Sequence, residues 1–412
     1  MADRWTDHVV WWHVYPLGAL GAPIREGHDE AHRLPRLLGW LDYLTALGAN
    51  GLQLGPIFAS TSHGYDTLDF HRVDPRLGDD ADFDTLVAAC HERGVKVMLD
   101  GVFNHVGVEH PLFRQALEQG PDSDAARLFR IDWSDPANPR PALFEGHGGL
   151  VALDHDAPQV ADLVADVMLT WLRRGIDGWR LDAAYAVPPA FWARVLPRVR
   201  AEFPDAWFVG EMIHGDYAGY VRESGLDAVT EYELWKSTWS SVQTRNLFEL
   251  AWTLKRHNEF LDAFLPMTFV GNHDVDRIAT KVGDDGAALA LVVLLTVGGM
   301  PSLYYGDEQA FRGAKTDGWG GDDEVRPALP DTPDGLAPLG AWMYRLHQDA
   351  IGLRRRHPWL AHARTREVSL ENERFCYEAV EPDGPGVLRV ELTLGERAGV
   401  RVLAGDEVLL EH

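Results

Sequence analysis

The chain has 412 residues, and its 38 basic against 63 acidic side chains leave a formal net charge of −25. This length allows one large domain of about 250 residues together with insertions and a small extra domain. The negative charge would repel phosphate backbones and anionic lipid, so we expect neither nucleic acid nor a membrane surface as a partner.

Cysteine content and the distribution of apolar residues narrow the setting further. The two cysteines, Cys90 and Cys376, lie far apart and form neither a disulfide framework nor a zinc-type spacing. Residues 1–8 are polar and lack the apolar core of a signal peptide. The longest apolar run, Ala287 to Val297, is too short to cross a bilayer and predicts a buried helix. We therefore expect a cytoplasmic location.

In chain order, short β-rich runs alternate with stretches of helical period, the pattern of parallel βα units. Eight runs predict strands: 9–14, 50–54, 95–99, 176–181, 207–209, 226–229, 267–270 and 300–304. Longer amphipathic stretches predict helices over 34–47, 82–93, 160–174 and 339–356, the first three of which end at a glycine. The pattern predicts an α/β protein with a (β/α)8 TIM barrel.

Two segments do not fit the βα alternation. Residues 105–155 are irregular and rich in proline, and they predict a short inserted subdomain after the third strand. Residues 358–412 hold short alternating runs separated by Gly and Asp, which predict a small antiparallel β domain. The barrel itself is then expected over 1–104 and 156–357.

Polar side chains follow several of the predicted strands. Such barrels carry their ligand and catalytic groups at the C-terminal strand ends. The residues at those positions are Asp100, Asn104, His105, Arg180, Asp182, Glu211, Asn272, His273 and Asp274. Any one of them alone would more commonly be a turn or capping residue. Their shared position at strand ends predicts one site.

Two of these carboxyl groups suit glycoside hydrolysis, which requires one ionised and one protonated carboxyl group. Asp182 follows Arg180 by two residues, so in a strand the guanidinium can lie beside the carboxylate and favour its charged form. Glu211 ends the bulky run Trp207-Phe-Val-Gly210, and a less polar setting favours the protonated acid.

Six segments, in order, resemble the α-amylase family, glycoside hydrolase family 13. The four diagnostic blocks correspond to Asp100-Gly-Val-Phe-Asn-His105, Gly178-Trp-Arg-Leu-Asp182, Val209-Gly-Glu211 and Phe269-Val-Gly-Asn-His-Asp274. His63-Gly-Tyr-Asp66 resembles the block after the second strand, and Pro301-Ser-Leu-Tyr-Tyr-Gly-Asp-Glu308 resembles the family's eighth strand. The resemblance covers roughly residues 8–310.

The resemblance assigns a role to each matching residue. It implies that Asp182 is the nucleophile, that Glu211 is the general acid/base and that Asp274 stabilises the transition state. The glucosyl ring being cleaved would be held by Tyr65, Asp100, His105, Arg180 and His273. Arg277 and Arg326 could also bind substrate, although a loop salt bridge is the commoner role for each.

The chain departs from the family pattern on the leaving-group side. Starch-cutting amylases carry a Lys-His pair just after the nucleophile block, where this chain has Ala184 and Tyr185. We therefore expect short maltooligosaccharides or a disaccharide α-glucoside as substrate. Further stacking residues are Trp179, Tyr185, Trp235, Trp239 and Trp319, with core packing at least as common a role for each.

No cofactor is expected to be required. In many relatives a structural calcium bridges the first block and the insertion, and Asn104 and Asp154 could supply oxygens for it here. The oligomeric state stays open.

Taken together, these features predict a retaining glycoside hydrolase that cleaves α-glucosidic bonds through a covalent glycosyl-enzyme. A transglycosylase using the same intermediate is the first competing hypothesis. Two more hypotheses stay open: a carbohydrate-binding barrel without catalysis, and a metal-dependent barrel hydrolase that uses some of the same His and Asp residues.

Overall fold

Eight parallel strands form a nearly closed barrel at the centre of the molecule. The computed structural model describes residues 4–25, 29–318 and 320–412. In order around the barrel the strands are β1 (Trp11–Val14), β2 (Gly51–Leu54), β5 (Lys96–Gly101), β10 (Gly178–Leu181), β11 (Trp207–Gly210), β12 (Ala228–Val229), β13 (Met267–Phe269) and β14 (Met300–Tyr304). β14 pairs with β1, and a parallel bridge from Thr230 to Met267 joins β12 to β13. The predicted TIM barrel and all eight strands are confirmed.

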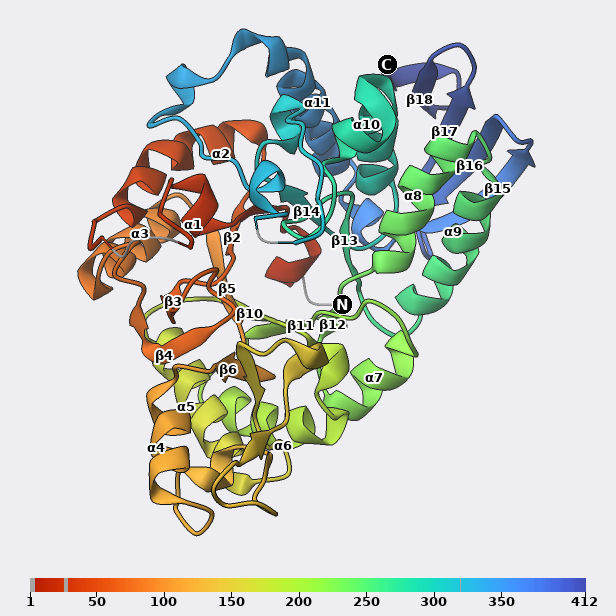
Figure 1. The fold of residues 1–412 in the computed structure, drawn as a ribbon. Coiled ribbons are helices and arrows are strands. Elements are labelled where there is room, and N and C mark those ends of the chain that lie inside the picture. Colours follow the sequence, from red (N-terminus) through yellow and green to blue (C-terminus); the bar gives the residue numbers. More distant parts are fainter. Residues whose placement is uncertain (1–3, 26–28, 319) are drawn as a thin grey trace.

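Helices surround these strands (Figure 1). They are α1 (Pro16–Ala19), α2 (Leu41–Leu47), α3 (Asp80–Glu92), α5 (Pro158–Arg173), α6 (Pro189–Arg200), α7 (Tyr217–Ser224), α8 (Tyr232–Thr244), α9 (Phe248–Leu261), α10 (Ile278–Thr296) and α11 (Ala341–Arg356). The strands are buried almost throughout because the barrel interior lies on one face and helices on the other.

Two of the predicted helices show how local sequence shapes this outer layer. The helix predicted over 34–47 starts as a 3-10 helix, Leu34–Trp40, with a proline in its first turn, before continuing as α2. The apolar run Ala287 to Val297 lies at the end of α10, whose last turns are fully buried. α10 contacts α8, α11 and the C-terminal sheet, so its last turns have no solvent face to carry polar residues.

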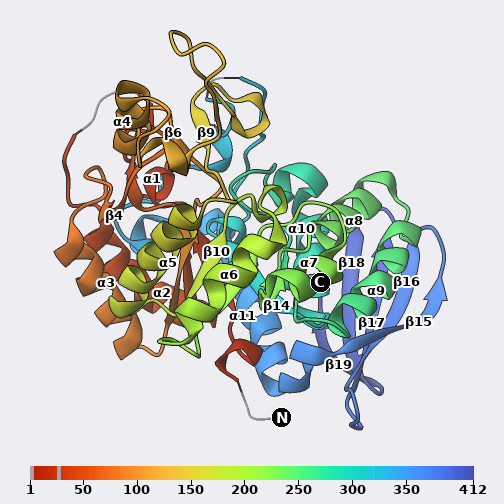
Figure 2. The same cartoon turned by 90° about the horizontal axis from the view of Figure 1, so that it is seen from below.

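The inserted segment is more ordered than its irregular sequence suggests. β6 (His105–Gly107) pairs antiparallel with β9 (Leu150–Ala152), and helix α4 (Pro111–Gln119), which the sequence pattern did not predict, lies between them in the chain. The small pair β7 (Ile131–Asp132) and β8 (Arg140–Pro141) completes the segment. It projects from the barrel far from the C-terminal sheet (Figures 1 and 2).

A second hairpin that was not predicted lies in the loop after β2. Its strands are β3 (Phe58–Ser60) and β4 (Thr67–Val73), and its turn carries Tyr65. The hairpin pairing therefore holds a predicted site residue over the end of the barrel.

The last residues form the predicted antiparallel sheet. Its strands, in spatial order, are β15 (Arg364–Leu370), β16 (Arg374–Val380), β17 (Val387–Leu394), β18 (Ala398–Ala404) and β19 (Glu407–Glu411). Alternating residues of β16 and β17 are buried, because one face of the sheet packs on the helices of the barrel. The alternating runs that predict this sheet, 387–392 and 400–403, lie within β17 and β18.

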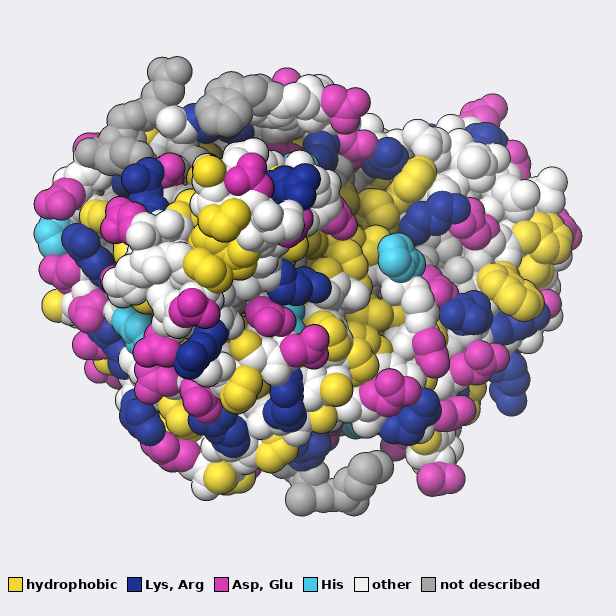
Figure 3. Space-filling view, turned by 60° about the horizontal axis from the view of Figure 1, so that its bottom comes forward, with side chains coloured by type: hydrophobic (Ala, Val, Ile, Leu, Met, Phe, Trp, Pro, Cys, Tyr) yellow, Lys and Arg dark blue, Asp and Glu magenta, His cyan; other side chains and the backbone are white. Residues whose placement is uncertain are grey.

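Charged side chains of both signs lie together on one face of the molecule. Figure 3 shows Asp and Glu side chains interspersed with Lys and Arg over the face in view. Among the described residues, no helix combines the length and the apolar character needed to cross a bilayer.

Candidate active site

Arg180 on β10 is the centre of the polar groups at the C-terminal end of the barrel. It is aligned with Asp100 of β5 in the strand register, and its Nη1 donates to both Asp100 oxygens at 2.8 Å. Nη1 also donates to Asp182 Oδ1 at 2.9 Å, and Nη2 lies 2.7 Å from Glu211 Oε1. One guanidinium thus gathers three carboxyl groups from three neighbouring strands, and all four side chains are buried.

The backbone after the nucleophile candidate is held in an uncommon conformation. Ala183 has a φ of 46° and a ψ of 37°, a left-handed geometry that is costly for a residue with a side chain. In this geometry its N–H donates to Glu211 Oε2 at 2.9 Å. The strained residue therefore fixes Glu211 directly beside Asp182.

Gly210 and Tyr232 complete the position of Glu211. A side chain at Gly210 would place its Cβ within 3.0 Å of Ala184 and 2.8 Å of Leu226, so only glycine lets β11 pass this close. From the start of α8, the Tyr232 hydroxyl donates to Glu211 Oε1 at 3.1 Å and accepts from Asn272 Nδ2 at 2.9 Å. The sequence offered no signal for Tyr232.

The ionisation of Asp182 differs from the sequence expectation. Burial raises the pKa of Asp182 well above its ordinary value, and repulsion from Glu211 and Asp100 adds to this, while Arg180 opposes it. The predicted contact with Arg180 is present. The positive charge of Arg180 is shared by three carboxyl groups, however, and does not offset the effect of burial on the pKa of Asp182. Asp182 ionises most readily when Glu211 carries a proton, because one source of repulsion is then gone.

Asp274 lies at the edge of the pocket in a different setting. Burial disfavours its charged form, yet His273 and Arg326 outweigh burial and hold the pKa of Asp274 well below its ordinary value. His273 Nε2 lies 3.0 Å from Asp274 Oδ2, and Arg326 Nη2 lies 2.9 Å from Oδ1. Asp274 therefore stays an anion and can accept hydrogen bonds from sugar hydroxyls.

The aromatic and histidine side chains predicted to hold the sugar lie in the same place. The Tyr65 hydroxyl donates to Asp100 Oδ2 at 3.1 Å and contacts His273 Nε2. His105 Nε2 lies 3.0 Å from the Tyr65 carbonyl oxygen, and its Nδ1 lies 3.1 Å from the Asn104 amide nitrogen. Burial lowers the pKa of His105 to about 4, so its ring is neutral near pH 7.

These groups open into a pocket of about 430 Å³. It is lined by Tyr65, His105, Phe144, Glu145, Leu150, Asp182, Ala183, Tyr185, Glu211, Ile213, Tyr232, Trp235, Asp274, Val275 and Lys315. The structure thus brings together the predicted catalytic set of Asp182, Glu211 and Asp274. It also adds wall residues from the insertion and from two distant loops, which sequence motifs did not reveal.

The leaving-group side of the pocket is shaped by Tyr185. Its hydroxyl donates to Glu145 Oε1 at 2.9 Å, which joins the loop after β10 to the inserted segment. Ala184 is fully buried and does not line the pocket. Of the two positions where many amylases carry Lys and His, Tyr185 therefore provides an aromatic wall residue and Ala184 a buried methyl group.

Arg277 is not among the pocket residues, contrary to its assignment as a substrate-binding residue. Its Nη1 donates to Asp307 Oδ1 at 2.9 Å, its guanidinium lies over the Tyr304 ring, and it is 1% exposed. Arg277 thus forms the loop salt bridge that the sequence analysis named as the commoner role for such a residue. Arg326 instead reaches the site through Asp274.

The remaining aromatic candidates separate by burial. Trp179 is 0% exposed and packs between Phe58 and Phe103, so it is a core residue. Tyr185 and Trp235 line the pocket, whereas Trp239 lies in a hollow next to it. Trp319 lies outside the described residues.

Each of the two proposed calcium ligands has a hydrogen-bond partner within the protein. Asn104 directs its amide nitrogen to His105, and Asp154 Oδ1 accepts from the Asp156 N–H at 3.2 Å. Ca²⁺ takes six to eight oxygen ligands. Within 4–25, 29–318 and 320–412, Asp154 belongs to no group of three His, Cys, Asp or Glu side chains that could share an ion. Amide and backbone oxygens also bind Ca²⁺, so calcium binding stays a prediction.

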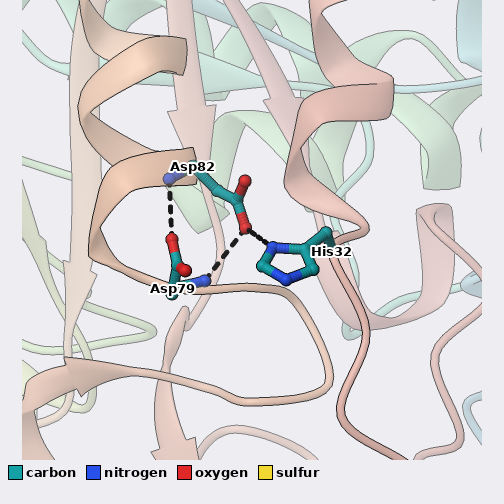
Figure 4. A group of neighbouring side chains, drawn as sticks. All are labelled: His32, Asp79 and Asp82. Atoms are coloured by element: carbon teal, nitrogen blue, oxygen red, sulfur yellow. Dashed lines mark hydrogen bonds and ion pairs between the residues drawn. The ribbon is translucent and has the colours of Figure 1, made fainter.

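One group of three such side chains does occur elsewhere, at His32, Asp79 and Asp82 (Figure 4). Its carboxylates already serve the start of α3. Asp79 Oδ1 accepts from the Ala81 and Asp82 N–H groups, and Asp82 Oδ2 accepts from the Asp79 N–H. The group is a capping box with a histidine attached to it.

Comparison with known proteins agrees with this geometry. The family model described as alpha amylase, catalytic domain, matches residues 37–333. Maltogenic alpha-amylase of Bacillus acidopullulyticus is 32% identical over 367 residues, which cover 80% of this chain and 61% of that protein. Cyclomaltodextrinase of Geobacillus thermopakistaniensis is 32% identical over 365 residues, which cover 81% and 60%. The chain thus spans about three fifths of the length of these curated relatives.

Among solved structures, cyclic alpha-maltosyl-(1→6)-maltose hydrolase from Arthrobacter globiformis, in complex with maltose, has a TM-score of 0.82. It is 25% identical, and the match covers 98% of this chain and 95% of that chain. The family model covers most of the chain, including every strand end that carries the buried carboxyl groups. The chain belongs to the α-amylase family, glycoside hydrolase family 13.

Proposed function

We propose that this chain hydrolyses α-glucosidic bonds with retention of anomeric configuration. The observation that carries the proposal is the shared guanidinium of Arg180, which holds Asp182 and Glu211 as neighbours in a buried site. A retaining mechanism requires the two carboxyl groups to lie about 5–5.5 Å apart.

In the first step, a carboxylate oxygen of Asp182 attacks the anomeric carbon while Glu211 protonates the departing glycosidic oxygen. The bond from carbon to the leaving oxygen breaks as the glycosyl–Asp182 ester forms. In the second step, Glu211 removes a proton from water, and the water oxygen displaces Asp182. The enzyme is restored, and water has added across the bond.

The surrounding residues supply charge and position. Asp274 is held ionised by His273 and Arg326, so it can accept hydrogen bonds that strengthen as positive charge develops on the sugar. Tyr65 lines the pocket, and its hydrogen bond to Asp100 holds its hydroxyl in place. Tyr232 and the Ala183 N–H hold Glu211 in place for the proton transfer.

Short maltooligosaccharides are the proposed substrates. The support is the names of the two relatives, maltogenic alpha-amylase and cyclomaltodextrinase, together with the pocket wall that Tyr185 and Glu145 form. The mechanism requires no cofactor. Calcium binding and a cytoplasmic location stay predictions.

Product stereochemistry tests the mechanism. Proton NMR of fresh products from maltotriose should show the α-anomer first, followed by slow mutarotation. Initial release of the β-anomer would overturn the retaining assignment. If the chain binds sugar measurably but releases glucose from none of a panel of α-glucosides, a binding protein is favoured instead.

Transfer to a second sugar uses the same covalent intermediate and competes with hydrolysis. The catalytic residues do not distinguish the two outcomes, because access of water and of an acceptor sugar decides between them. Incubation with maltotriose separates them, since products longer than the substrate require transfer.

A further inference from the structure

A second hollow adjoins the pocket of the candidate site. Its volume is about 270 Å³, and it is lined by Trp235, Trp239, Val270, Val275, Asp276, Ile278, Lys281 and Lys315. Trp235, Val275 and Lys315 line both the hollow and the catalytic pocket. A chain-like ligand that leaves one therefore enters the other along a shared wall.

The wall combines aromatic faces with charged side chains. Trp235 and Trp239 lie one turn apart on α8, with ring centroids 5.8 Å apart, and both are only partly buried. Lys281 Nζ lies 4.3 Å from the Trp239 ring centroid and 2.8 Å from Asp276 Oδ2. Aromatic carbon beside hydrogen-bonding charges matches a sugar ring, which has apolar C–H faces and a rim of hydroxyls.

Core packing would explain two tryptophans on a helix, but it does not explain this arrangement. A core tryptophan such as Trp179 is 0% exposed. Trp235 and Trp239 also pack on the core, but each keeps part of its side chain exposed. In the hollow, the Lys281–Asp276 pair is partly exposed, at 27% and 26%, and faces the same space as the rings. The hollow is thus built as an open polar and aromatic surface.

The helix also indicates on which side of the scissile bond the hollow lies. Tyr232, the first residue of α8, donates to Glu211, and Trp235 follows it within one turn. Glu211 is the group that protonates the leaving oxygen in the proposed mechanism. The hollow therefore extends the pocket on the leaving-group side.

We propose that the hollow bounded by Trp235, Trp239, Lys281 and Asp276 binds a further glucose unit on the leaving-group side. The proposal rests on the proposed function, because the side is defined by the role of Glu211. It makes this chain prefer oligosaccharides longer than a disaccharide, and it gives an incoming acceptor sugar a place to bind during transfer. Binding energy gained at this distance increases kcat/KM for the longer substrate only.

The first test compares substrates of different length. Trp239→Leu and Lys281→Met alter the hollow without touching the catalytic pocket, whereas Trp235 is left intact because it lines both. Trp252→Leu is the matched control, since Trp252 lies on α9, is 64% exposed and lines neither space.

In Trp239→Leu, the ratio of kcat/KM for maltotetraose to that for maltose should fall about tenfold, and in Lys281→Met about threefold. The control should keep the wild-type ratio. Circular dichroism establishes that each variant is folded, and Lys281→Met decides the outcome if Trp239→Leu does not fold. A ratio within twofold of wild type in the folded variants overturns the proposal.

The second test measures binding without turnover. Isothermal titration of maltotetraose into the Asp182→Asn chain and into the Asp182→Asn, Trp239→Leu double variant should show about tenfold weaker binding in the double variant. Equal affinities overturn the subsite. Absence of turnover by the wild-type chain overturns the proposed hydrolysis, and the binding comparison then decides the subsite independently.

Discussion

Replacing Asp182 by Asn should abolish activity and stabilise the fold. Asp182 shares one guanidinium with Asp100 and Glu211, so three carboxyl groups are balanced by a single buried Arg180. The amide oxygen of Asn can still accept the 2.9 Å hydrogen bond from Arg180, while the negative charge is gone. We expect kcat to fall by about four to six orders of magnitude, because an amide is not a competent nucleophile.

The stability gain follows from the direction of the Asp182 pKa. Because burial raises the pKa in the folded state, the folded chain binds more protons than the unfolded chain, and ionisation at higher pH destabilises it. The substitution should therefore stabilise the neutral-pH fold by about 1–2 kcal/mol, or roughly 1–2 °C in Tm for a chain of this length. The gain should disappear as the pH falls below the ordinary Asp pKa of 3.8.

Asp74→Asn is the matched control, with the same chemical change and the opposite expected sign. Asp74 is buried and pairs with Arg76 at 2.7 Å, and Arg76 has no second carboxylate partner among the described residues. Its loss leaves a buried cation unbalanced, so we expect about 3–5 kcal/mol of destabilisation.

Thermal unfolding from pH 3 to pH 8 and assays with maltotriose measure both effects. If Asp182→Asn lowers Tm as Asp74→Asn does, Asp182 acts as a structural ion-pair partner and the charge-repulsion argument is wrong. Retained turnover would show that the nucleophile is misassigned.

Three further changes test other parts of the structure. Arg326→Met should lower kcat/KM about 100-fold in steady-state assays, because Asp274 loses its 2.9 Å contact with the Arg326 guanidinium. An unchanged kcat/KM would show that Arg326 has only a structural role. Burial raises the pKa of Glu308 from 4.5 to about 7, so the folded chain keeps a proton on Glu308 that the unfolded chain loses. The free energy of unfolding should therefore fall by about 3 kcal/mol as the pH rises from 4.5 to 7. Glu308→Gln should remove this pH dependence in denaturant titrations, and a persisting slope would contradict the assignment. EDTA should leave Tm and activity unchanged, whereas a fall in Tm that Ca²⁺ restores would establish a calcium site.

The order and the period of the sequence were sufficient to predict the barrel. Each strand is a short buried run between turn residues, and helices of clear amphipathic period separate most of them, so local patterns carry the information. The same period predicted that Arg180 and Asp182 lie on one side of β10, which their 2.9 Å contact confirms.

Contacts between distant segments required the tertiary structure. Arg277 and Arg326 both follow loops near the site and cannot be distinguished by local pattern, yet one pairs with Asp307 and the other with Asp274. Tyr232 reaches Glu211 only because α8 begins beside β11, and Glu145 reaches Tyr185 only because the insertion folds back over the pocket.

The ionisation of the site shows the same division. The sequence determines which residue types stand at the strand ends, and therefore which catalytic groups are available. How many carboxyl groups share Arg180 depends on strand register, and the pKa of Asp182 depends on burial. Register and burial are properties of the folded barrel as a whole, because electrostatic energy depends on distance and on exclusion of water rather than on separation along the chain.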